Sequence, residues 1–422
     1  TSFDAGSHSF LQNTLNADIT RSFKTIYNGL DLAFGAEYRV ERYNIKAGNI
    51  GSYVNGGAQS FPGFSPLNEV NKNRNSVAVY TDVEVDFTDK FLVGIAGRYE
   101  DYSDFGNTTN GKITSRYKAT DNFFIRASVS TGFRAPSLQQ QYFNNIATDV
   151  VDGKILNSGI FRTDSDIAKQ LGIPKLKQET SNDYSIGIVY SPSKQFHITV
   201  DAYQVKIDNR IILTGNLGND PYGDAVPELQ SLFATYGAQT GRFFTNAINT
   251  TTNGIDLVVD YNLTLGKGTL NASFLYNYNK NKVDTKLNHI PTAFIGQEDV
   301  YFGPQERSLI ETNTPKHKGT LALNYALNKF NFLLRNTYFG EVTRDGFPFG
   351  IAQKHNGKVV TDLTVSYKIT PKIQFIAGAN NLLDVFPDEQ AYENSYFGVF
   401  KYAPVQMGTT GAYYFGRLNF SL

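Results

Sequence analysis

The residues of this sequence that could carry chemistry are few and scattered. Its five histidines have no neighbours at metal-ligand spacing, and no Gly-x-Ser-x-Gly sequence is present to hold a nucleophilic serine. Cysteine is absent, which excludes a thiolate metal site and a disulfide framework. We therefore predict no catalytic residue, no metal site and no cofactor. The histidines are His8, His197, His289, His317 and His355.

Two other patterns resemble known sites only in part. Gly106–Lys112 has the spacing of a phosphate-binding loop, but Ile113 replaces the Ser or Thr that would contact magnesium, so we interpret it as an exposed hairpin. Four aspartates of one polar segment offer the oxygen ligands that calcium prefers, but their spacing matches no calcium loop. We interpret them as solvated charges: Asp149, Asp152, Asp164 and Asp166.

Charged residues also recur at every second position of apolar segments. Asp82, Glu84 and Asp86 share one face of such a segment, and Arg98 is predicted on the same face of the next one. Arg126 alternates with apolar residues in the same way. A metal or acid–base role is one reading of these charges. The interpretation we favour is a hydrated wall facing the lumen of a β-barrel.

Aromatic residues concentrate in the long polar segments, where they suit ligand contact. Their rings could stack on a ligand, or they could pack the loops against one another. For ligand contact we single out Tyr142, Phe143, Tyr222, Tyr236, Tyr301, Phe347, Tyr392 and Tyr396.

The elements that must position these residues are predicted to be about fifteen long β-strands. Apolar and polar residues alternate within them, and their length exceeds the usual ~5–6 residues of soluble sheets. Strands of about 9–11 residues are needed to cross a bilayer. The clearest are Leu30–Tyr43, Asn75–Phe87, Phe91–Ser103, Phe123–Phe133, Asn182–Tyr190, Gln195–Ile212, Gly254–Leu265, Thr269–Asn281, Lys318–Leu327, Phe330–Thr343, Val359–Ile369, Ile373–Leu382 and Thr409–Leu422.

The connections between these strands alternate between short and long, which decides between a soluble β-sandwich and a membrane barrel. Short turns on one rim and long loops on the other are typical of outer-membrane barrels. The sequence therefore predicts an all-β transmembrane antiparallel barrel whose C-terminus lies in the periplasm. The long connections are Asn44–Arg74, Asp104–Gly111, Ala135–Lys177, Gly215–Gly241, Val283–Pro315, Asp345–Gly357 and Asp384–Gly408.

Composition agrees with this interpretation. The 39 basic and 39 acidic residues balance, so no net charge attracts nucleic acid. The 26 Tyr and 32 Phe, with no Trp, suit strands and membrane interfaces. No long apolar run predicts a transmembrane helix, and Thr1 does not begin a signal peptide.

An odd strand count cannot close a barrel, so we expect further strands before residue 1, unless the count is wrong by one.

Several motifs resemble those of TonB-dependent outer-membrane receptors. Ser130–Gln140 is similar to a motif of that family, and Lys177–Gly187 looks like the strand start that follows it. Ala379–Asp384 resembles the end of the penultimate strand, and Tyr413–Leu422 resembles the terminal strand, with Leu422 where the family usually has Phe. The resemblance implies a barrel of about 22 strands filled by a plug. Residues 1–422 would then be its C-terminal part, without the plug and the first strands.

The function implied by this resemblance is TonB-coupled uptake of a scarce nutrient across the bacterial outer membrane, with an iron–siderophore complex as the first ligand class. The implied partners are the TonB complex, through the absent N-terminal part, outer-membrane lipid, a small nutrient ligand and a possible surface lipoprotein, but no nucleic acid. The alternatives are uptake of an oligosaccharide or cobalamin, a passive porin, a structural barrel and a surface enzyme.

Overall fold

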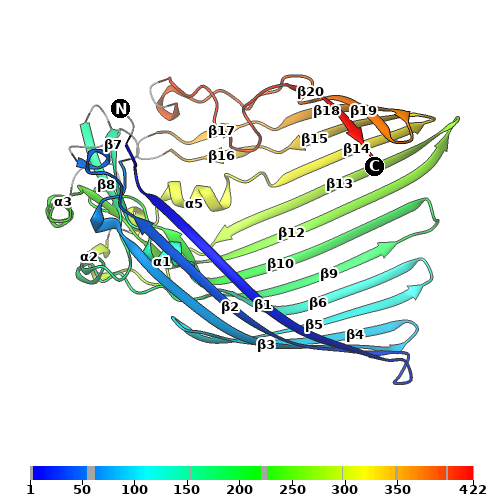
Figure 1. Ribbon diagram of the computed structural model, residues 1–422, viewed down its shortest axis with the longest axis horizontal. Coiled ribbons are helices and arrows are strands. Elements are labelled where there is room, and N and C mark those ends of the chain that lie inside the picture. The colour runs from blue at the N-terminus through cyan, green and yellow to red at the C-terminus, as the bar shows by residue number, and fades with distance from the viewer. Residues whose placement is uncertain are drawn as a thin grey trace.

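The chain folds into one wide curved antiparallel sheet with a cluster of loops at one of its two rims (Figure 1). The computed structural model describes residues 3–54, 62–151, 154–219, 226–296, 298–346, 350–395 and 398–421. Tyr222, Phe347 and Tyr396, which we predicted as ligand contacts, lie outside these residues. No helix in the described ranges is long and apolar enough to span a membrane.

The large sheet contains fifteen strands, as the sequence predicted, and almost every strand pairs with its neighbours in chain order. The strand labels missing from this order belong to small strands of the loops. In spatial order the strands are β1 (Ser7–Phe23), β2 (Leu30–Lys46), β3 (Val70–Thr88), β4 (Phe91–Tyr102), β5 (Gly106–Thr120), β6 (Phe123–Arg134), β9 (Glu179–Tyr190), β10 (Phe196–Leu213), β12 (Phe244–Leu265), β13 (Gly268–Val283), β14 (His317–Leu327), β15 (Phe330–Phe339), β18 (Lys358–Thr370), β19 (Ile373–Asn380) and β20 (Tyr413–Phe420).

Alternation along each strand places apolar side chains on the outer face of the sheet. In β3, Val77 is 53% exposed and Val79 is 41% exposed, whereas Ser76 and Ala78, which alternate with them, are buried. An apolar face that is exposed on every strand is costly in water and favourable in lipid. The wall therefore has the surface of a membrane-spanning barrel.

Exposed aromatic rings form a row beside the short turns. Phe87 packs on Tyr27 at 5.0 Å between ring centroids and on Phe91 at 6.2 Å. Tyr99 is a second exposed ring on β4, eight residues after Phe91. Eight residues span about 27 Å along a strand, which strand tilt reduces towards the ~25 Å apolar band of outer-membrane barrels. Further exposed rings near the turns are Tyr117, Tyr190, Tyr261 and Phe330.

The rim without the loop cluster carries the short turns (Figure 1). Between β14 and β15 only Asn328 and Lys329 reverse the chain, and Asn328 adopts a φ of 53°, which asparagine tolerates better than most residues. The opposite rim carries the long connections, with one exception. The predicted Asp104–Gly111 loop is wrong, because β5 begins at Gly106 and its ladder to β4 continues to the hairpin. Gly106–Lys112 is therefore mainly a paired strand.

The long loops contain secondary structure that the sequence did not predict. A three-stranded sheet joins two loops through β7 (Asn145–Val151), β8 (Lys154–Ile160) and β11 (Thr240–Arg242). A second sheet pairs β16 (Val342–Arg344) with β17 (Gln353–His355). The helices are α1 (Leu138–Tyr142), α2 (Asp166–Gln170), α3 (Pro227–Ala234), α4 (Glu298–Tyr301) and α5 (Pro304–Glu311), with 3₁₀ turns η1 (Ile50–Ser52), η3 (Pro66–Asn68), η4 (Thr292–Phe294) and η5 (Tyr392–Asn394).

Three of these loops share one hydrophobic core, which we call the loop core. They are the β6–β9, β10–β12 and β13–β14 connections, and the loop core has Phe233 and Phe243 at its centre, both fully buried. Phe161 stacks on these two rings at 5.7 and 5.8 Å between centroids. The loops are therefore a packed unit that holds its surface residues in place.

Candidate functional site

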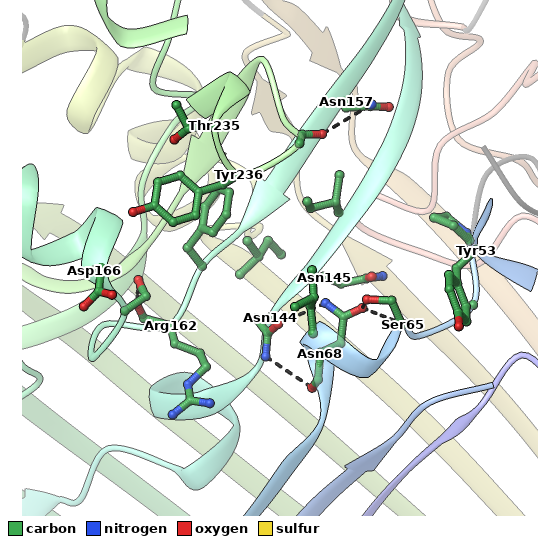
Figure 2. Close-up of a pocket in the computed structure, with 18 of the residues that line it drawn as sticks. Tyr53, Ser65, Asn68, Asn144, Asn145, Asn157, Arg162, Asp166, Thr235 and Tyr236 are labelled. Carbon is green, nitrogen blue, oxygen red and sulfur yellow. Dashed lines mark hydrogen bonds between the residues drawn. The ribbon is translucent and has the colours of Figure 1, made fainter. Parts of the chain in front are cut away.

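A cavity lies among the loops (Figure 2). Its volume is about 820 Å³, within the usual range of about 300–1,000 Å³ for small-molecule pockets. Three chain segments line it: the β2–β3 loop, the β6–β9 loop and the turn that follows α3. We call this space the loop cavity.

Amide side chains form much of the lining of the loop cavity. Asn68 Nδ2 donates to Asn144 Oδ1 at 2.9 Å, which joins the β2–β3 loop to the β6–β9 loop. Asn68 Oδ1 in turn accepts from the backbone N–H of Ser65 at 2.8 Å. Asn157 donates its backbone N–H to Gln239 Oε1 at 2.6 Å, which joins β8 to the segment before β11. The Asn157 side chain donates from Nδ2 to Gly237 O at 3.4 Å, so all three amide side chains are hydrogen-bonded to the protein (Figure 2).

The charged residues of the cavity lining are already paired. Arg162 Nε and Nη2 donate to the two carboxylate oxygens of Asp164 at 2.8 and 2.6 Å. Burial opposes ionisation of Asp164, but the hydrogen bonds and charge of Arg162 prevail and lower the pKa of that carboxyl. Asp166 accepts from Lys169 Nζ at 2.8 Å. Asp164 and Asp166, which we interpreted as solvated charges, are therefore each paired with a nearby cation.

Aromatic rings supply an apolar side to the loop cavity. Tyr236 meets Phe161 edge to face at 6.3 Å between centroids, and both line the cavity. Because Phe161 stacks on the loop core, Tyr236 is held on a rigid base. Tyr53 lines the cavity from the β2–β3 loop (Figure 2). A ligand entering the space would meet rings, amides and one paired arginine.

Helix α2 anchors the charged side of the cavity. Ser165 is its N-cap, because the Ser165 hydroxyl oxygen accepts the N–H of Ala168 at 3.4 Å and donates to Arg162 O at 2.6 Å. Ile167 and Ala168 are fully buried in the loop core. The cap and the buried face together fix the start of α2, and with it the segment of Arg162 and Asp164 that precedes the helix.

The aromatic residues predicted to contact ligand have different positions in the structure. Of those described, Tyr236 lines the loop cavity, and Tyr392 is 67% exposed on a separate loop. Tyr142 lies between two cations, with Lys72 Nζ 5.1 Å and Arg162 Cζ 5.4 Å from its ring centroid. Burial raises the pKa of Tyr142, so its hydroxyl stays protonated near neutral pH.

Two of these predicted contacts pack the loops instead. Phe143 meets Phe64 edge to face at 6.4 Å in a small cluster beside β2 and β3. Tyr301 is fully buried, stacks on Phe294 at 5.8 Å and shares a hydrogen bond of 2.8 Å with Thr245. Burial raises the pKa of Tyr301 to about 12. Ligand contact by Tyr301 is therefore the wrong prediction, because a ring with no exposed surface cannot reach a ligand.

The predicted lumen-wall charges share the inner face of the sheet. Cross-strand register places Arg98 opposite Tyr80, on the same face as Asp82 and Glu84. Arg98 forms an ion pair of 3.4 Å with Glu37 and donates to Glu100, and Arg98 Cζ lies 5.1 Å from the Tyr80 ring centroid.

The other two wall charges also have partners on the inner face. Asp86 lies 3.7 Å from Arg116, and Arg126 forms a two-pronged ion pair with Asp201 at 2.9 and 2.6 Å. In contrast, Asp82 and Glu84 have no ionic partner among the described residues. The inner wall is therefore polar and partly neutralised within itself.

Two sequence motifs that are distant in the chain meet at the loop rim. Arg134, at the end of β6, pairs with Glu179 at the start of β9, and Glu179 also accepts the N–H of Ile211 at 2.7 Å. Ser137 then caps α1, while Arg74 donates to Pro136 O at 2.7 Å. The motif residues thus fix the point where the wall passes into the loops.

Comparison with known protein families matches residues 1–382 to "TonB dependent receptor-like, beta-barrel". The chain belongs to the TonB-dependent receptor family. The match covers β1 to β19 and confirms the family predicted from the motifs at Ser130–Gln140 and Lys177–Gly187. Tyr413–Leu422 lies outside the matched residues. This is a family of outer-membrane receptors rather than enzymes.

Named relatives are distant. The vitamin B12 transporter BtuB of Photobacterium profundum is 24% identical over 177 residues, which cover 40% of this chain and 25% of the transporter. The siderophore receptor PirA of Acinetobacter baumannii is 14% identical with a TM-score of 0.65, covering 98% of this chain and 55% of PirA. The ferric enterobactin receptor PfeA of Pseudomonas aeruginosa is 13% identical with a TM-score of 0.66, covering 98% and 54%. The chain spans about half the length of these two siderophore receptors and matches a quarter of the vitamin B12 transporter.

Most of the loop-cavity residues were missed by sequence reasoning. Tyr236 was predicted, but Asn68, Asn144, Asn157 and Arg162 were not. No spacing rule connects these positions, because they come from separate loops. The adjacent Asn144 and Asn145 are the one local signal, since paired amides in a loop beside aromatic residues suit a polar binding surface.

Proposed function

We propose that this receptor captures a small nutrient at its loops and passes it across the outer membrane with energy supplied through TonB. The observation that carries the proposal is the loop cavity, a preformed pocket on a packed loop core at the rim opposite the short turns. A passive pore has no need of such a pocket. Under this proposal the loop rim is extracellular, and the C-terminal end of β20 lies at the periplasmic rim.

The proposal includes further parts of the protein. Strands β1 and β20 each pair with one neighbour and not with each other in the described sheet. Unpaired strand edges are unfavourable in lipid, so we infer that additional strands complete a barrel of about 22 strands. A plug domain in its lumen would pack against the inner wall at Asp82, Glu84 and Arg98. We propose that the N-terminal part of the protein, which includes the plug, contacts TonB. A surface lipoprotein is a further partner that we propose.

An iron–siderophore complex is the ligand class we propose first. It is supported by the siderophore receptors among the proteins of similar fold. Cobalamin is the second candidate, and the sequence similarity to a vitamin B12 transporter favours it. The two differ in what the cell would lack without the receptor: iron or the vitamin.

Deletion of the complete receptor gene tests this function. We expect the deletion strain to lose accumulation of one labelled nutrient from a panel of ferric siderophores and cobalamin. In the parent strain, collapse of the proton-motive force should abolish the same accumulation, because TonB coupling depends on it. Accumulation that persists without the proton-motive force would contradict the proposal and support a passive porin.

A further inference from the structure

The charge balance of the loop cavity restricts the ligand that it can hold. Its described lining contains one arginine and two aspartates as the only side chains charged near neutral pH. The arginine is bound on two sides, by the carboxylate of Asp164 and by the ring of Tyr142. Asp166 on the same wall is paired with Lys169, which does not belong to the lining. An anion entering this space would find no unpaired cation among the described lining residues.

The same lining is well suited to neutral polar groups. Asn68, Asn144 and Asn157 belong to the cavity wall, and amides can both donate and accept hydrogen bonds. The side chains of Asn68 and Asn144 are held by their mutual hydrogen bond, and Asn157 Nδ2 donates to Gly237 O at 3.4 Å, so a ligand would not have to order them on binding. Fixed amides of this kind match carbonyl and hydroxyl oxygens, whose hydrogen bonds require no countercharge.

Rings on one side give the cavity an apolar surface beside its amides. Tyr236 and Phe161 form that surface, and Tyr53 adds a third ring from another loop. Ring faces pack well on the carbon skeleton of a compact ligand. A highly charged ligand would instead lose its hydration against these rings without a compensating ion pair.

We propose that the loop cavity binds a neutral ligand rich in carbonyl and hydroxyl oxygens and excludes strongly anionic complexes. This inference rests on the proposed uptake function. A ferric trihydroxamate, in which three hydroxamates neutralise the iron, has this chemistry, and so does a neutral oligosaccharide. A ferric tricatecholate such as ferric enterobactin carries a strong net negative charge and does not.

Binding to the purified full-length receptor tests the charge preference. Three probes are compared by titration calorimetry: ferrichrome as the neutral hydroxamate, a neutral maltooligosaccharide, and ferric enterobactin as the anion. We expect one neutral probe to bind at least about tenfold more tightly than the anion. Which of the two neutral probes binds shows whether the ligand is a ferric hydroxamate or an oligosaccharide. Tighter binding of ferric enterobactin would overturn the inference.

Substitutions at Thr235 test whether the loop cavity is the site. Thr235 is an exposed lining residue at the end of α3. Thr235→Lys supplies an unpaired cation and should raise the affinity for ferric enterobactin about tenfold. Thr292→Lys places the same charge on η4, outside the described lining, and should leave both affinities unchanged. Equal effects of the two variants would place the anion elsewhere and contradict the inference.

Tyr236 provides the complementary loss of binding. Tyr236→Ala should weaken the neutral probe about tenfold or more by removing the ring, whereas Tyr236→Phe keeps the ring and should retain most of the affinity. Neutral-probe affinity that is unchanged in Tyr236→Ala, or no neutral binding at all, would also overturn the inference.

Uptake in cells separates failure of this inference from failure of the proposed function. If ferric enterobactin accumulates through the receptor only when the membrane is energised, energy-coupled uptake stands and the neutral-ligand inference fails. If neutral-ligand binding responds to Tyr236→Ala but no probe accumulates in an energy-dependent way, the cavity assignment stands and the uptake function fails.

Discussion

The wall and the loop core bury their apolar residues in opposite ways. On the wall, Ile95 is 55% exposed in the middle of β4, and apolar neighbours continue this surface from strand to strand. In the loop core, Phe233 and Phe243 have no exposed surface, and the helices of three loops enclose them. The wall has the apolar exterior expected of contact with lipid, whereas the loop core has the apolar interior of a water-soluble domain.

This difference shows that the protein contains two structures with separate sources of stability. The wall is held by a continuous antiparallel ladder and by the lipid around it. The loop core is held by hydrophobic burial between segments that are distant in the chain. The loop cavity depends on the second structure, since Phe161 connects Tyr236 to the buried rings. Damage to one structure should therefore leave the other largely intact.

The largest effect is expected from Phe233→Ala in the loop core. Removal of a fully buried phenylalanine typically costs about 3–5 kcal/mol, because the cavity that remains cannot collapse completely. We expect rapid hydrogen exchange in residues 160–175 and 226–242, while β14 and β15 in the wall keep their protection. Mass spectrometry of peptides from the full-length receptor measures both regions. Equal loss of protection in the wall would show that the two structures unfold together.

A smaller effect is expected from an arginine placed in the lipid-facing surface. Ile95→Arg should lower the free energy of unfolding by about 2–4 kcal/mol, the usual cost near the bilayer centre. Ala96→Arg is the matched control, because residue 96 faces the lumen opposite Asp82. Denaturant titration of the receptor in lipid vesicles compares the two variants. A similar cost at both positions would contradict the assignment of the outer face to lipid.

The smallest effect is expected from acidification, which should lower the stability of the β16–β17 hairpin by protonating His355. Burial lowers the pKa of His355, while Asp388 partly opposes this and Arg344 and Lys358 add to it. Because the folded-state pKa is below the unfolded value of about 6.5, stability is complete above that pH and falls as the pH decreases towards the folded pKa. The protection factors of β16 and β17, which correct the exchange rate for its intrinsic dependence on pH, should therefore be lower at pH 5.5 than at pH 7.5.

His355→Gln provides the control for this pH effect, because glutamine does not titrate in this range. Exchange in the variant should depend on pH only through the intrinsic chemistry of the amide protons. An unchanged difference between the two pH values in His355→Gln would assign the effect to another group, such as Asp388.

The positions of the loop residues could not be predicted from the sequence. Tyr236 and Tyr301 are both aromatic residues of long polar segments, and nothing in their neighbourhoods distinguishes them. One lines a cavity and the other is fully buried. The hydrogen bond between Asn68 and Asn144 joins residues 76 positions apart, and that between Asn157 and Gln239 joins residues 82 positions apart. No local pattern encodes such contacts.

The sequence by itself determined the wall of this receptor. Alternation with a period of two sets which face of each strand meets lipid, and short turns set the pairing of consecutive strands, so both are local properties. The motif at Ser130–Gln140 added the family. Only the tertiary structure decided how the loops fold, that Ser103–Phe105 is a tight hairpin, and that amides from separate loops meet around a cavity. Loop packing depends on hydrophobic contacts between distant segments, and those contacts form only when the wall has brought the segments to one rim.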